Sequence, residues 1–128
     1  TRRVGAFFGK FKHYGLAIDS GKTASEDWAD FGGMTIALRG LKKVLDSQEA
    51  NDGLRKEAYR NFFIAYAVSW RTLLKKEKMV YSLMTSVHAP AEDRVDRIVP
   101  QFQEWVDAFD IQKGDALYIP RGQRLKFF

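Results

Sequence analysis

Apolar residues recur at intervals of three and four along most of the chain, the spacing that gathers side chains on one face of an α-helix. The pattern predicts a first helix from the start of the chain to about Tyr14, stopped by Gly15. A second helix is predicted to begin at Thr23, whose hydroxyl would form a capping box with Glu26. Its apolar face contains residues at helical spacing: Trp28, Phe31, Thr35, Leu38, Leu41 and Leu45.

Polar residues 48–53 interrupt the pattern, which returns from Leu54 to about Leu74 and predicts a third helix. Between Asn61 and Trp70 this segment is apolar almost all round. A helix without a polar face is normally buried, so we expect the third helix to be central.

A fourth helix is predicted over residues 75–87, and it ends before Pro90 because proline cannot continue the hydrogen-bond ladder. A shorter amphipathic helix is expected around residues 102–109. The tail, residues 114–128, is expected to be irregular apart from a short extended segment at 117–119. The predicted fold class is therefore mainly α.

Length and composition indicate one packed domain, because the 128 residues are 45% hydrophobic and 14% aromatic. No stretch approaches the ~20 apolar residues of a transmembrane segment. The net charge of +5 is not clustered into a basic face, so we do not expect nucleic acid as a partner. Since the chain has no cysteine, a metal would have to be held by His, Asp or Glu.

Two carboxylates lie four residues apart in the second predicted helix, at Glu26 and Asp30. They share one helix face, where like charges are unfavourable unless a cation or a histidine N–H lies beside them. The alternative is that Glu26 serves only the capping box and Asp30 is a solvated acid stabilised by the helix dipole. The residues alone leave both interpretations open.

Gly32 and Gly33 follow the two acids, and each costs about 1 kcal/mol relative to alanine inside a helix. We expect a continuous helix there, with another helix or a ligand close to its backbone. His88 follows a helix end, from which its imidazole could enter a cleft, and Arg94 could grip oxygen acceptors through its planar fork. A solvated histidine and a surface arginine are the alternatives.

Taken together, these motifs resemble the C-terminal part of the neprilysin and endothelin-converting-enzyme family of zinc metalloendopeptidases, which are gluzincins. Residues 19–33 resemble the family's turn and G-E-N-x-A-D-x-G-G segment, and residues 62–70 its F-F-x-x-(F/Y)-A-x-x-W helix. Residues 85–90 resemble T-D-V-H-x-P, with Arg94 at the family's spacing. The resemblance implies that residues 1–128 are a single C-terminal fragment of a thermolysin-like metalloprotease catalytic domain. The lack of cysteine favours a bacterial-type member.

The resemblance also implies roles for individual residues. Glu26 corresponds to the third zinc ligand, and Asp30 to the acid that orients a zinc-bound histidine. His88 corresponds to the residue that stabilises the oxyanion of the reaction, and Arg94 to the arginine that holds a substrate carbonyl. The cofactor implied is Zn²⁺, which lowers the pKa of its bound water and polarises the scissile carbonyl.

The H-E-x-x-H motif, which in the family supplies two zinc ligands and the catalytic glutamate, is absent from the sequence. In the family this motif lies upstream of the segment that contains Glu26, and the chain reads as a cut piece of a longer protein. We therefore expect the fragment to be inactive alone and to act on small peptides only together with the upstream part of its domain. Asp27 stands where the family usually has asparagine, and Ser86 where it has aspartate.

Two further interpretations stay open. The chain could be a non-catalytic helical interaction module that retains the peptidase scaffold, which an upstream sequence without H-E-x-x-H would favour. A basic nucleic-acid-binding domain is the other, and it predicts strongly salt-dependent binding. For a peptidase of this family we favour an extracytoplasmic location, secreted or periplasmic, over a cytoplasmic one.

Overall fold

The computed structural model describes residues 11–126, and most of them are helical. The mainly α prediction is confirmed. The elements, in chain order, are the strands β1 (Lys12–His13) and β2 (Leu16–Ala17), the helices α2 (Ser20–Ser47), α3 (Asp52–Ser69), α4 (Lys76–Thr85) and α5 (Ala91–Asp96), the 3₁₀ turn η1 (Val99–Gln101), the helix α6 (Gln103–Ala108) and the 3₁₀ turn η2 (Arg121–Gln123). Within the described residues, no helix combines the length and the apolar character that crossing a membrane requires.

A short hairpin precedes the first long helix. Strands β1 and β2 are antiparallel, and His13 pairs with Leu16. The turn between them contains Tyr14 at φ 51° and Gly15 at φ 81°, and two successive positive φ angles suit the tight turn of a two-residue hairpin. The helix predicted to reach Tyr14 is therefore wrong for residues 11–14, and the rest of that prediction lies outside the described residues.

Helix α2 begins three residues before the predicted start. The side chain of Asp19 caps it by accepting hydrogen bonds from two amides of the first turn. The hydroxyl of Thr23 donates instead to Asp27, at 2.8 Å. The predicted capping box between Thr23 and Glu26 is therefore wrong, because the helix already has a cap one turn earlier.

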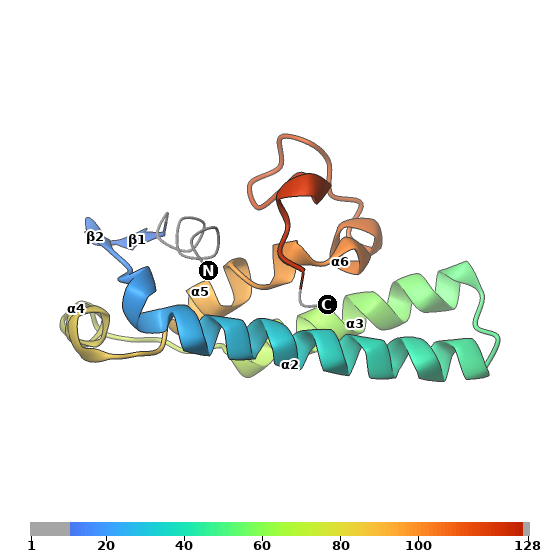
Figure 1. Cartoon of the computed structure of the whole chain (residues 1–128), viewed down its shortest axis with the longest axis horizontal. Helices are drawn as coiled ribbons and strands as arrows, with labels where there is room; N and C mark the ends of the chain where they lie inside the picture. The colour runs from blue at the N-terminus through green and yellow to red at the C-terminus, as the bar shows by residue number, and fades with distance from the viewer. Residues whose placement is uncertain (1–10, 127–128) are drawn as a thin grey trace.

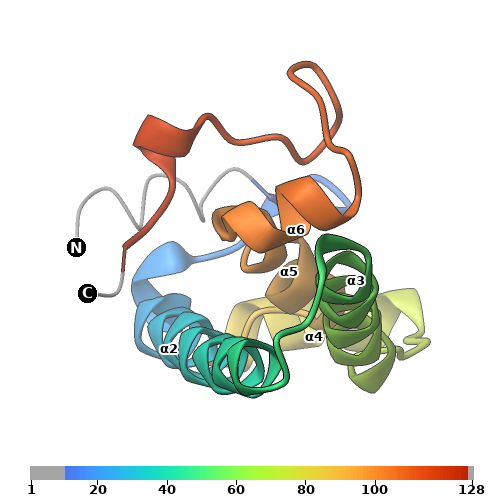
Figure 2. The same cartoon turned by 90° about the vertical axis from the view of Figure 1, so that its right-hand side faces the viewer.

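The long helices α2 and α3 run antiparallel, and α5 and α6 lie across one side of this pair (Figures 1 and 2). Helix α2 continues through Gly32 and Gly33, as predicted. The turn after α2 has Glu49 at φ 49°, and the side chain of Asn51 caps α3 by accepting from the amide of Leu54 at 2.9 Å.

The hydrophobic core lies between α2, α3 and the segment that joins α5 to α6. It contains these buried residues: Phe31, Met34, Leu38, Phe63, Ile98, Val99 and Phe102. Phe102 connects the two long helices, because its ring centroid lies 5.3 Å from that of Phe31 and 6.0 Å from that of Phe63. This packing holds the α5 segment against α2, where the candidate site is found.

Helix α3 is less central than predicted. Phe63 is its buried residue, whereas Ile64 and Val68 are 46% and 54% exposed. Its last helical residue is Ser69, so the predicted end near Leu74 is also wrong. One face of this apolar helix packs on the core, and the opposite face is uncovered by the described residues.

The later elements agree in part with the sequence pattern. Helix α6 confirms the amphipathic helix expected around residues 102–109. The structure assigns no strand at residues 117–119, where the short extended segment is expected, and Leu117 belongs to a turn. Helix α5 was not predicted, because its six residues are too few for apolar periodicity to reveal it.

Candidate functional site

The four residues singled out by the sequence lie together where the first turns of α2 face α5. Glu26 and Asp30 come from α2, His88 from the connection between α4 and α5, and Arg94 from α5. They form two ion pairs, Glu26 with His88 and Asp30 with Arg94. Each acid therefore has its own basic partner, which accounts for the two carboxylates on one helix face.

The Glu26–His88 pair lies at the surface. Nε2 of His88 is 3.1 Å from Oε2 of Glu26, and the two side chains are 49% and 38% exposed. The amide of His88 donates to the hydroxyl oxygen of Ser86 at 3.0 Å, which shapes the irregular backbone that carries the imidazole. The Glu26 carboxylate is thus open to solvent and faces a nitrogen that can donate a hydrogen bond.

The Asp30–Arg94 pair is more buried and is bidentate. Nε and Nη2 of Arg94 donate to the two carboxylate oxygens of Asp30 at 2.7 and 2.6 Å, with both side chains about 15% exposed. The guanidinium of Arg94 also lies 3.8 Å from the ring centroid of Trp70. The hydroxyl of Tyr66 donates to the carbonyl of Arg94 at 3.1 Å. Arg94 is therefore an oriented side chain that α2 and α3 hold in place together.

A second ion pair joins the same two segments in the interior. Nη2 of Arg97 donates to Oδ2 of Asp27 at 2.8 Å, and the side chains are 0% and 2% exposed. Burial raises the pKa of Asp27 and lowers the pKa of Arg97, while each partner's charge opposes the shift of the other. The sequence pattern did not predict this pair. Its only signals were an acid at position 27 in place of asparagine and an arginine three residues after Arg94.

The hairpin is attached to the same region by a third pair. Nε2 of His13 lies 2.5 Å from Oδ2 of Asp93, whose side chain is 2% exposed. Burial raises the pKa of Asp93, and the hydrogen bond and charge of His13 oppose that change. Nothing in the spacing of these residues, eighty positions apart, indicates that they meet.

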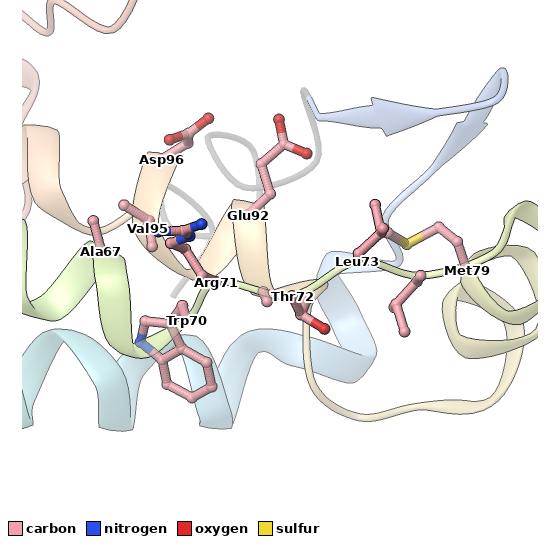
Figure 3. A pocket seen from close by; sticks show the side chains of 11 residues that line it. Ala67, Trp70, Arg71, Thr72, Leu73, Met79, Glu92, Val95 and Asp96 are labelled. Carbon is pink, nitrogen blue, oxygen red and sulfur yellow. The ribbon is translucent and has the colours of Figure 1, made fainter.

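An open hollow of about 640 Å³ adjoins the site. It is bounded by the end of α3, the connection to α4, and α5. Figure 3 shows Glu92 and Asp96 projecting from α5 on the opposite side from Trp70. Trp70 lines this hollow and also contacts Arg94, so the hollow and the ion pairs share a wall.

One residue of the site fits zinc. Among residues 11–126, no three His, Cys, Asp or Glu side chains are grouped closely enough to hold a metal ion. Glu26 offers an accessible carboxylate, the oxygen donor that zinc accepts, whereas both oxygens of Asp30 already accept from Arg94. The described residues therefore supply fewer than three donors at this site, and a complete site needs others from outside them.

Comparison with known proteins gives consistent matches. A model of peptidase family M13 matches residues 6–125. Endothelin-converting enzyme-like 1 of Homo sapiens is 28% identical over 113 residues, which cover 86% of this chain and 15% of that protein. Neprilysin-1 of Caenorhabditis elegans is 29% identical over 115 residues, covering 84% of this chain and 15% of that protein.

Neutral endopeptidase of Lactobacillus helveticus is 27% identical over 128 residues, which cover 98% of this chain and 18% of that protein. The chain thus spans between 15% and 18% of the length of these relatives. No solved structure gives a significant match.

Proposed function

Because the chain belongs to peptidase family M13, we propose that it is the C-terminal part of the catalytic domain of a zinc-dependent endopeptidase that cleaves small peptides. The relatives it matches are about six times as long, so the activity would belong to a larger protein of which this chain is one part. An extracytoplasmic location, secreted or periplasmic, is part of the same proposal and rests on the family resemblance.

The observation that carries the proposal is the meeting of Glu26, Asp30, His88 and Arg94, which come from three separate segments. Carboxylates and bases in a cleft-like arrangement also occur in purely structural ion-pair networks. The exposed Glu26–His88 pair argues against that interpretation, because an ion pair so accessible to water contributes little to stability.

In the proposed enzyme, Glu26 supplies one carboxylate oxygen to Zn²⁺, and the remaining protein donors come from the upstream part of the domain. When bound, the zinc would polarise the scissile carbonyl and acidify a water molecule. Asp30, held by the fork of Arg94, would orient an upstream histidine through its ring N–H.

His88 and Arg94 are proposed to act on the substrate. The imidazole of His88 would donate a hydrogen bond to the negative charge that develops on the substrate carbonyl oxygen. Its 49% exposure leaves room for a peptide to approach. Arg94 would support the site through Asp30 and bind a backbone carbonyl of the peptide.

The test is to compare the full-length protein with its Glu26→Gln variant and with the 128-residue chain alone. We expect the full-length protein to bind zinc and cleave peptides, and the chain alone to do neither. Glu26→Gln is expected to weaken zinc binding by more than ~100-fold, beyond the range of residues that only support a ligand. Unchanged zinc affinity would refute the ligand assignment, and an upstream sequence without H-E-x-x-H would favour a non-catalytic interaction module.

A further inference from the structure

Helices α2 and α5 are connected by ion pairs at matching intervals. Asp27 and Asp30 are three residues apart on α2, and Arg94 and Arg97 are three residues apart at the end of α5. Asp30 binds Arg94, and Asp27 binds Arg97. Side chains three apart share a helix face, so the two pairs lie one turn from each other and fix both the rotation and the axial position of α2 against α5.

The inner pair, Asp27–Arg97, is not needed for the stability of the core. The outer pair is Asp30–Arg94. Asp27 and Arg97 are almost completely buried, and apolar residues of similar volume at such positions are often equally stabilising or more so. A charged pair adds a defined relative orientation of the two helices, because the carboxylate and guanidinium have one favourable geometry. The hydroxyl of Thr23 donates to the same Asp27 oxygen, Oδ2, and restricts that carboxylate further.

Glu26 directly precedes Asp27, and no buried contact within the described part of the chain fixes the direction of its own side chain. The Glu26 carboxylate lies 3.1 Å from Nε2 of His88, and this contact is open to solvent. Glu26 belongs to the second turn of α2, close to the start of the helix. A rotation of this turn would displace the Glu26 carboxylate directly. The nearest side chain that resists such a rotation is the buried one next to it.

We propose that Asp27 and Arg97 are positioning residues that hold α2 in the rotation at which the Glu26 carboxylate can reach the metal. This role rests on the proposed function, in which Glu26 is a zinc donor. The Asp30–Arg94 pair supports the same rotation about one turn further along α2, and the Asp27–Arg97 pair sets the geometry where solvent cannot compete.

The experiment measures zinc affinity by competition with a chelator in the full-length protein, at a temperature well below the unfolding midpoint of each variant. Asp27→Asn is expected to weaken zinc binding about 10- to 100-fold. The double variant Asp27→Leu/Arg97→Met replaces the charges by apolar groups and is expected to recover thermal stability. Its zinc affinity is expected to stay as low as that of Asp27→Asn, because apolar side chains do not restore the fixed rotation of α2.

Asp46→Asn is the matched control, since it makes the same change at an exposed acid on the same helix, and it should leave zinc affinity unchanged. Wild-type affinity in Asp27→Asn would overturn the positioning role, as would affinity that returns together with stability in the double variant. Glu26→Gln separates the two proposals. If it weakens zinc binding while Asp27→Asn does not, only the positioning role fails, whereas unchanged binding in Glu26→Gln refutes both.

Discussion

Arg97 is a cation without access to water, and its partner Asp27 is equally enclosed. Removing one member of a buried ion pair leaves the other without its compensating charge. We therefore expect Arg97→Met to lower the free energy of unfolding by about 3–5 kcal/mol, measured by equilibrium urea denaturation. Arg121→Met, at an exposed arginine, should change it by less than about 0.5 kcal/mol. If Arg97→Met lowers the free energy of unfolding no more than Arg121→Met does, the Asp27–Arg97 pair contributes nothing to stability.

The phenol of Tyr66, whose hydroxyl donates to the carbonyl of Arg94, has a shifted pKa that can be measured. Burial, and secondarily the charge of Asp30, raise the pKa of its phenol to about 12, from 10.0. Because the folded pKa is the higher one, the stability contributed by this group is fully present below pH 10 and is lost as the pH rises through about 12. The ultraviolet absorbance of tyrosinate should therefore show a late-ionising group that Tyr66→Phe removes. A wild-type curve in which every tyrosine ionises near pH 10 would contradict this environment.

The residues of the candidate site differ in how far the sequence could predict them. Glu26, Asp30, His88 and Arg94 were singled out from their spacing and chemistry, and the family resemblance supplied their roles. The structure brings the four together, and the roles stay predictions. The Asp27–Arg97 pair could not be found in this way, because charged residues are assigned to the surface unless a partner is known. That partner is seventy residues away in the chain.

At the level of elements, α2 and α6 were predictable because apolar periodicity reflects the face that packs on the core. The hairpin β1–β2 and α5 were not, because each is too short for a period and depends on contacts made elsewhere. The ion pair between His13 and Asp93 connects these two elements to each other. Long-range interactions of this kind leave no local pattern in a sequence.

The glycines of α2 allow a test of what covers this helix. A Cβ added at Gly33 would meet no atom within 4 Å, so Gly33→Ala should stabilise the 128-residue chain by up to about 1 kcal/mol in urea denaturation. In the full-length protein the same change should instead destabilise, because we expect the upstream zinc-binding helix to approach the backbone there.

Gly40 is the control for this prediction. It is also helical with open space around it, and it lies about two turns further from the candidate site. Gly40→Ala should stabilise both the chain and the full-length protein. Equal stabilisation by Gly33→Ala in both would show that no helix packs closely against this part of α2.

Across the whole molecule, several large apolar side chains of the two long helices are exposed to solvent, including Ile36 at 63% and Val68 at 54%. A chain that spans less than a fifth of the length of its relatives is expected to leave such faces uncovered. The sequence predicted the mainly α class. It did not predict which apolar faces pack within this chain, because a periodic stripe does not identify its partner.

The proposed function depends on Glu26, which is proposed to give one oxygen donor to a zinc ion whose other protein donors lie upstream. X-ray absorption at the zinc edge of the full-length protein reports which atoms bind the metal. We expect imidazole nitrogens together with a carboxylate oxygen at about 2.0–2.2 Å, and a changed coordination shell in Glu26→Gln. A zinc shell that is identical in the wild type and in Glu26→Gln would contradict it.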